Sequence, residues 1–173
     1  MGGPMPAVNQ PKGSVSAGSI KPVTRKAVRC QREVAWLVTQ AAGKLVATTD
    51  DVNAPTPSFV LAAALSHARE QEQAAQDNGR AIDYEAVMGP GLASFCAAVG
   101  LPTAPNALSD AGYMFTLSGA NLIRDLYAYC SDLGERMGDA VQVKPGYAIK
   151  LALRLFLLDG ASAATASDGK TSA

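Results

Sequence analysis

Residues 144–160, KPGYAIKLALRLFLLDG, decide how the fold of this chain is interpreted. Pro145 near the start and Gly160 at the end are residue types that commonly begin and end a helix. Between them only Lys150 and Arg154, four residues apart, form a polar stripe. A helix that is apolar almost all round lies either in the centre of a core or against another subunit. In the second case the expected contacts between copies are Tyr147, Ile149, Leu153 and Phe156.

An earlier stretch at residues 57–65, PSFVLAAAL, has a similar pattern. At an offset of 88 residues, Pro57 aligns with Pro145, Phe59 with Tyr147 and Leu65 with Leu153. An apolar-faced helix is expected before each stretch, which predicts a pseudo-repeat of two helical hairpins over residues 24–78 and 118–159. Helices often start with proline, however, and Ala and Leu are abundant here, so two unrelated helices that begin in a similar way explain the match better than a duplication does.

Apolar periodicity predicts most of the remaining structure. A first helix is expected after Thr24 as N-cap, and its first turns would place Arg25, Arg29 and Arg32 on one basic face. Further helices are expected from Pro57 to Gly79, over residues 83–88 and 92–99, and from a Ser118 cap to Gly138. Residues 113–117, YMFTL, also fit a short strand. We therefore predict an all-α fold, a compact bundle of about five to six helices with at most one short strand near residues 113–117.

Both ends of the chain are rich in small and turn-forming residues without apolar periodicity. Residues 1–22 and 160–173 are expected to be flexible tails around a helical domain over residues 23–159. Residues 1–32 carry six basic and no acidic side chains, whereas residues 33–137 carry twelve acidic and five basic ones. A basic arm ahead of an acidic body suits contact with phosphates or with the acidic surface of another copy, or it is a solvated tail. The candidate nucleic-acid contacts are Lys21, Arg25, Lys26, Arg29, Arg32, Lys150 and Arg154.

The second half of the chain carries a family resemblance. YMFTLSGANLIRDLYAYCSDLG followed by GYAIKLALRLFLLDG resembles the strand–helix–helix order of ribbon-helix-helix DNA-binding proteins, over about residues 113–160. The resemblance implies a dimer whose short strands pair and enter the major groove of DNA. Thr116 is the only polar side chain that strand residues 113–117 offer to bases, and the connection ERMGDAVQVKPG is longer than the tight turn of the family. The resemblance therefore implies the dimer-forming helical pair more directly than the DNA contacts.

The sequence shows no pattern typical of catalysis or of metal binding. It has no Gly-rich phosphate loop, a single histidine and three widely spaced cysteines, so we expect a non-catalytic protein without metal or cofactor. The apolar runs are too short to span a membrane, and the cysteines are expected to be buried, reduced thiols of a cytoplasmic protein.

Three functions are consistent with these features. The first is a nucleic-acid-associated regulatory or accessory protein that acts as a homo-oligomer with a basic N-terminal arm. The second is a self-assembling structural subunit, such as the coat protein of a helical virus, which would place the protein in a virion. The third is a small helical adaptor that binds other proteins.

Overall fold

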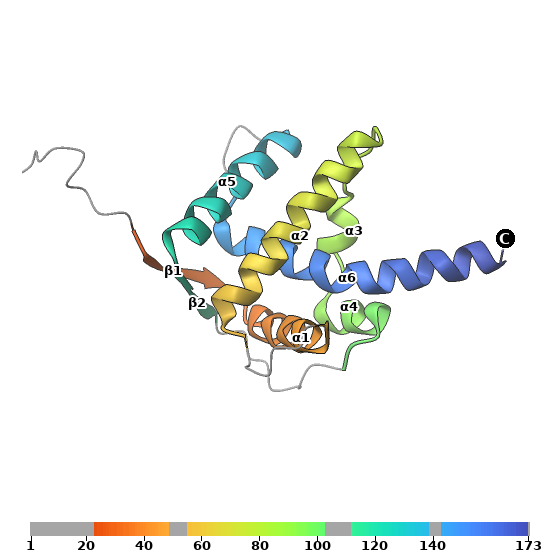
Figure 1. Cartoon of the computed structure of the whole chain (residues 1–173), viewed down its shortest axis with the longest axis horizontal. Helices are drawn as coiled ribbons and strands as arrows, with labels where there is room; N and C mark the ends of the chain where they lie inside the picture. Colours follow the sequence, from red (N-terminus) through yellow and green to blue (C-terminus); the bar gives the residue numbers. More distant parts are fainter. Residues whose placement is uncertain (1–22, 49–54, 103–111, 139–142, 173) are drawn as a thin grey trace, which may run out of the picture.

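A computed structural model of the chain describes residues 23–48, 55–102, 112–138 and 143–172, with side chains described up to Leu158 in the last range. Within these residues six helices and a two-stranded sheet are formed, and the sheet lies at one side of the helices (Figure 1). This confirms the predicted helical class and the short strand near residues 113–117. The predicted arm over residues 1–22, including Lys21, lies outside the described residues. The elements are β1 (Arg25–Cys30), α1 (Glu33–Thr48), α2 (Pro57–Asp77), α3 (Tyr84–Met88), α4 (Leu92–Val99), β2 (Tyr113–Ser118), α5 (Ala120–Arg136) and α6 (Pro145–Ser172).

The first element, β1, corrects a sequence-based expectation. The helix predicted after Thr24 begins only at Glu33, and the six residues before Gln31 form a strand instead. In β1 the buried residues Val28 and Cys30 alternate with the exposed Arg29, which is the period of a strand. A partner strand far along the chain makes this conformation favourable, and sequence periodicity alone does not reveal that partner.

The sheet pairs β1 with β2 in antiparallel register, with Ala27 opposite Thr116 in the middle. One face of this ribbon is buried against the helices through Val28, Cys30, Phe115 and Leu117. The other face is exposed to solvent. It presents Arg25, Ala27 and Arg29 from β1, and Met114, Thr116 and Ser118 from β2.

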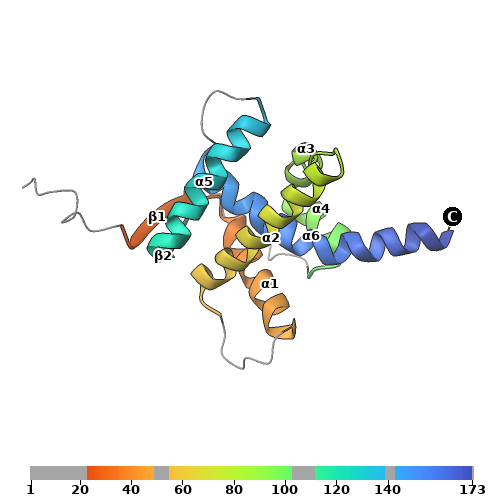
Figure 2. The same ribbon diagram turned by 45° about the horizontal axis from the view of Figure 1, so that its top comes forward.

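The order strand–helix–helix occurs twice in the chain, as β1-α1-α2 and as β2-α5-α6. In both units the second helix begins with a proline, Pro57 or Pro145, and α2 packs against α6 in the middle of the molecule (Figure 2). The short helices α3 and α4 lie between the two units in sequence and contact α6. Each predicted hairpin is thus preceded by a strand, of which the sequence predicted the second, β2, but not the first, β1.

Helix α6 forms the centre of the core. Ile149 and Leu153 have no exposed surface, because α1, α2, α5 and β1 surround this part of the helix. Phe156 is nearly buried and Tyr147 half-buried in the same chain, so of the two places that the sequence allowed for this helix, the structure shows the core. The helix end predicted at Gly160 is wrong, since α6 continues to Ser172.

The connections between elements agree with most of the predicted breaks. Gly79 and Gly100 follow α2 and α4, and Asp83 caps α3 by accepting from the Ala86 amide at 3.1 Å. The predicted Ser118 cap is wrong, because Ser118 ends β2 and Gly119 is the N-cap of α5. At a φ of 111°, Gly119 turns the chain directly from strand to helix, a conformation that residues with a Cβ rarely adopt.

None of the described helices has both the length and the apolar character needed to cross a membrane.

Candidate nucleic-acid interface

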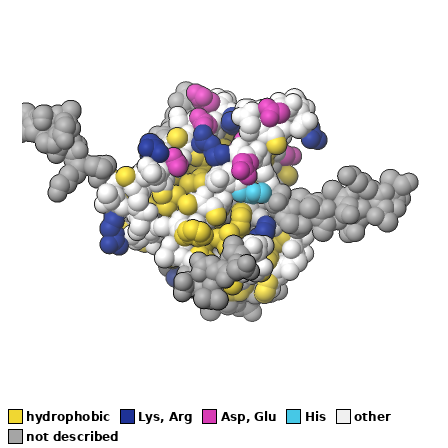
Figure 3. Space-filling view, in the orientation of Figure 1, with side chains coloured by type: hydrophobic (Ala, Val, Ile, Leu, Met, Phe, Trp, Pro, Cys, Tyr) yellow, Lys and Arg dark blue, Asp and Glu magenta, His cyan; other side chains and the backbone are white. Residues whose placement is uncertain are grey.

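Three arginines project into solvent at and beside the ribbon. Arg25 and Arg29 belong to the exposed face of β1, and Arg32 lies in the turn between β1 and α1. None of the three joins an ion pair with another described residue. In Figure 3 a group of Lys and Arg side chains appears at the edge of the molecule where β1 lies in Figure 1, whereas acidic side chains gather over α2, α3 and α5. The ribbon is therefore a part of the described surface where several cations are free to meet an anion.

Lys26 has a different position from the other cations of β1. Its neighbours in sequence point to the outer face, so Lys26 itself belongs to the inner series with Val28 and Cys30. At the end of the strand it remains exposed, with Nζ 5.7 Å from the centroid of the Tyr127 ring on α5. Lys26 can contribute charge beside the ribbon, but it does not lie on the exposed face.

The structure removes Arg154 from the candidate nucleic-acid contacts. Its side chain has no exposed surface. Nη1 donates to the carbonyl oxygens of Val87 and Pro90 at 3.0 and 2.7 Å, and Nη2 donates to Glu33 Oε2 at 2.9 Å. The guanidinium also lies over the Phe95 ring, 4.7 Å from its centroid. Arg154 therefore joins α6 to α1, α3 and α4, and it cannot reach a phosphate.

Lys150 is held in the same cluster. Its Nζ lies 2.8 Å from Glu33 Oε1 and donates to Gln31 Oε1 at 2.8 Å, and the side chain is only 13% exposed. Burial alone would raise the pKa of Glu33, but hydrogen bonds and positive charge from Lys150 and Arg154 outweigh burial and lower that pKa below its ordinary value. The polar stripe of α6 is thus neutralised inside the protein. Sequence reasoning missed Glu33 because it is 121 residues away from Arg154.

Helix N-termini lie at both edges of the ribbon. At the start of α2, Ser58 Oγ donates to the Thr116 carbonyl at 3.3 Å and accepts from the Ser118 amide at 2.9 Å, so it takes up the outer edge of β2. At the start of α6, Gly146 lies so close to β1 that a Cβ there would be 2.5 Å from the Arg29 carbonyl oxygen. Neither helix has an acidic residue in its first turn. The positive ends of two helix dipoles therefore flank the exposed face.

A hollow of about 880 Å³ lies between β1 and the start of α6. Arg29, Tyr127, Lys144, Tyr147 and the stem of Lys150 contribute to its lining. Lys144 is exposed and joins no ion pair among the described residues, so it adds an unpaired cation beside the ribbon. Lys144 is absent from the contacts predicted from the sequence, although its position directly before Pro145 places it at the start of α6.

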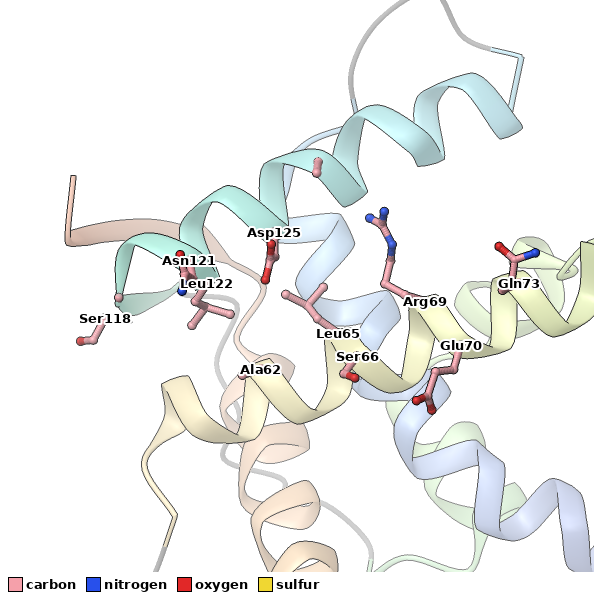
Figure 4. A pocket seen from close by; sticks show the side chains of 12 residues that line it. Ala62, Leu65, Ser66, Arg69, Glu70, Gln73, Ser118, Asn121, Leu122 and Asp125 are labelled. Atoms are coloured by element: carbon pink, nitrogen blue, oxygen red, sulfur yellow. The ribbon is translucent and has the colours of Figure 1, made fainter. Parts of the chain in front are cut away.

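A second hollow, of about 730 Å³, lies between α2 and α5 and differs in charge. Figure 4 shows Arg69 on α2 and Asp125 on α5 in the gap between the two helices, near Leu65 and Leu122, whereas Glu70 projects from the lower side of α2. Arg69 is paired with Asp132 at 2.7 Å and Asp125 with Arg124 at 3.5 Å, so Glu70 is the charged lining residue without an ion pair among the described residues. This hollow is therefore unfavourable for a phosphate.

The other buried polar groups have structural roles. The Tyr84 hydroxyl lies 2.8 and 2.7 Å from the two carboxylate oxygens of the buried Glu72, and Arg136 approaches the same carboxylate at 3.7 Å. These contacts hold α3 and the end of α5 to α2.

All three cysteines are buried free thiols, as the sequence predicted, and burial raises the pKa of Cys30 and of Cys130 to about 11. Among the described residues no three His, Cys, Asp or Glu side chains are grouped closely enough to hold a metal ion.

Comparisons of the chain with protein-family models, with curated proteins and with solved structures found no match. What the ribbon can bind is therefore inferred from its own side chains and their geometry.

Proposed function

We propose that this protein binds duplex DNA through the exposed face of the β1–β2 ribbon and acts as a non-catalytic regulatory or accessory protein. The observation that carries the proposal is the ribbon itself: it is exposed on one face, and Arg25 and Arg29 project from that face without an ion-pair partner among the described residues. A two-stranded ribbon fits the major groove of B-DNA, where side chains reach the base edges.

Duplex DNA suits this surface better than duplex RNA does. The major groove of B-DNA is about 12 Å wide and admits a two-stranded ribbon, whereas the major groove of A-form RNA is too narrow and deep for side chains to read. Arginine is also the side chain that most often contacts guanine, since its planar fork donates to both major-groove acceptors of that base.

The surroundings of the ribbon suit the phosphate backbones on either side of a groove. The N-termini of α2 and α6 flank the two edges of the sheet, and a helix N-terminus favours an anion. Arg32 and Lys144 are exposed beside β1 and can neutralise phosphates there. Such contacts orient a protein on DNA without reading its sequence.

The resemblance to ribbon-helix-helix proteins agrees with this proposal and extends it. The sequence suggested one strand–helix–helix unit, over residues 113–160, and the structure contains a second, β1-α1-α2, whose strand pairs with β2. Strand β2 carries no cation, and the ribbon obtains Arg25 and Arg29 from β1, in the unit β1-α1-α2. The ribbon that would form between two chains in that family is here formed within one chain.

A binding assay on matched duplexes tests the proposal. We expect fluorescence anisotropy at low salt to show binding of the full chain to a labelled DNA duplex and weaker binding to an RNA duplex of the same sequence. Replacement of both Arg25 and Arg29 by Gln should weaken DNA binding by about tenfold or more. The matched control is Arg80→Gln, which removes one cation beyond the far end of α2. Failure to bind any duplex would reject the proposal.

Self-assembly is a second candidate function, and one observation favours it. Helix α6 continues to Ser172 and extends away from the other helices in both views (Figures 1 and 2). A projecting helix that docks on another part of a second copy makes a head-to-tail contact, and such contacts generate rings or helical filaments. Light scattering after size exclusion distinguishes the candidates: a filament-forming subunit gives a mass that grows with concentration, and a DNA-binding monomer does not.

A further inference from the structure

We propose that one chain, acting alone, recognises an asymmetric DNA site, with guanine contacts made from β1 and a thymine contact made from β2. This inference rests on the proposed function and adds the class of DNA sequence that the ribbon reads. Proteins that read DNA as symmetric dimers bind sites whose two halves are inverted copies of each other. The ribbon of this protein has the arrangement of such a dimer without its symmetry.

The register of the sheet defines where the symmetry would lie. Ala27 and Thr116 are directly opposite each other in the middle of the ribbon, and both point outward. A twofold axis through this pair and perpendicular to the sheet would exchange β1 with β2. It would place Arg25 on the position of Met114 and Arg29 on the position of Ser118.

The side chains at these exchanged positions differ in chemistry. Arg25 and Arg29 each offer a fork of N–H donors, which matches the two acceptors that guanine presents in the major groove. Met114, which is 51% exposed, offers an apolar side chain that can contact the methyl group of thymine. Ser118 has a small hydroxyl that accepts and donates and so discriminates little. The two strands of the ribbon therefore favour different bases.

Both outer edges of the ribbon are already in contact with other residues of the same chain. Ser58 bonds to the free edge of β2 at Thr116 and Ser118, and the start of α6 lies against the free edge of β1 at Arg29. A second copy cannot extend the sheet at these positions without displacing them. One chain thus supplies the whole ribbon, and one chain is expected per site.

Selection from a random duplex pool with the purified full chain tests the inference, followed by native mass spectrometry on the selected duplex. We expect an enriched sequence whose guanines are not repeated as an inverted copy, and a complex of one chain with one duplex. Arg25→Gln and Arg29→Gln should each remove the preference for one guanine and weaken binding to the selected site by about tenfold. Circular dichroism of each variant checks that the fold is retained.

A symmetrised ribbon provides the matched control. The double variant Met114→Arg and Ser118→Arg gives both strands the same outward cations, so the guanines of its selected site should become an inverted repeat. An inverted repeat selected by the natural chain, two chains per duplex, or binding without any enriched sequence would each overturn the inference while leaving DNA binding intact. Absence of binding to the whole pool would instead reject the proposed function.

Discussion

Arg154 donates to Glu33 across 121 residues of sequence, at 2.9 Å and from a position with no exposed surface. The contact joins the central helix α6 to the start of α1, directly after the ribbon strand β1. The same guanidinium donates to two carbonyl groups at the end of α3 and just after it. Arg154, which the sequence places in a basic stripe, therefore joins α6 to the start of α1 and to the end of α3.

Removal of Arg154 should be strongly destabilising. In Arg154→Ala the Glu33 carboxylate loses one of its two cations, and two carbonyl groups lose their donor. We expect the free energy of unfolding, measured by urea titration with circular dichroism, to fall by about 3–5 kcal/mol. Arg124→Ala is the matched control, because Arg124 is 71% exposed and its ion pair with Asp125 is long, at 3.5 Å. Equal stability of the two variants would show that the buried cluster contributes little.

The Glu33 cluster should also make stability depend on pH. The pKa of Glu33 is lowered in the folded protein, so its contribution is fully present above the unfolded pKa of about 4.3 and is lost as pH falls through the lower folded value. The difference in unfolding free energy between the natural chain and Glu33→Gln should therefore be largest near neutral pH and shrink below about pH 4. Urea midpoints at a series of pH values check this, and a difference that stays constant with pH would contradict it.

Close contact between α6 and β1 should make Gly146 intolerant of a side chain. A Cβ would lie 2.5 Å from the Arg29 carbonyl oxygen, and backbone atoms on both sides leave little room to move. Gly146→Ala should lower the unfolding free energy by about 1–3 kcal/mol. Gly43→Ala should act in the opposite direction, raising stability by about 0.5–1 kcal/mol, because Gly43 is inside α1 with no atom within 4 Å of the added Cβ. Thermal melts of both variants give the comparison, and two shifts of the same sign would refute the packing argument.

Phosphate contacts beside the ribbon should appear in the salt dependence of DNA binding. Replacing both Arg32 and Lys144 by Gln removes two exposed cations without touching the outward face of the strands. The slope of the logarithm of affinity against the logarithm of salt concentration should become shallower by about two, and affinity should fall equally for all sequences. Arg80→Gln should leave the slope unchanged. A slope that is identical in the double variant and the natural chain would place the phosphates elsewhere.

The centre of α6 should not accept a charge. Leu153 has no exposed surface and is surrounded by apolar side chains, so Leu153→Asp buries a carboxylate without a partner. We expect loss of the cooperative thermal transition and of soluble protein. Val46→Asp on the exposed side of α1 introduces the same charge where 43% of the side chain is exposed, and should leave the fold intact. A soluble Leu153→Asp protein with native circular dichroism would show that α6 is not the core of this fold.

Local signals were sufficient to predict most helices. Pro57 begins α2 and Gly100 ends α4 because their backbone preferences act within one turn of the chain, whatever the rest of the protein does. The strand β1 was missed because Val28 and Cys30 fit a helical stripe as well as an alternating one. Its choice of strand depends on pairing with β2, and the partner lies far along the sequence.

The candidate site could be predicted only in part for the same reason. Arg25 and Arg29 are exposed on the same face, as predicted, but this face belongs to a strand of the ribbon and not to a helix. The composition of α6 gave no sign that Glu33 would bury Arg154 and pair with Lys150, since a buried ion pair requires a partner that only the tertiary fold brings near. Charge patterns along a sequence indicate which residues are cationic, and burial decides which of them are available.

The long separation of β1 from β2 in sequence affects when the ribbon can form during synthesis of the chain. Four helices intervene between the strands, so the ribbon closes a long loop of the chain and cannot form until Tyr113–Ser118 has left the ribosome. A nascent or truncated chain that ends before Tyr113 carries Arg25 and Arg29 on a segment without a pairing partner. The surface proposed to hold DNA is thus absent until synthesis has passed Ser118, so DNA binding reports that both strands have been made.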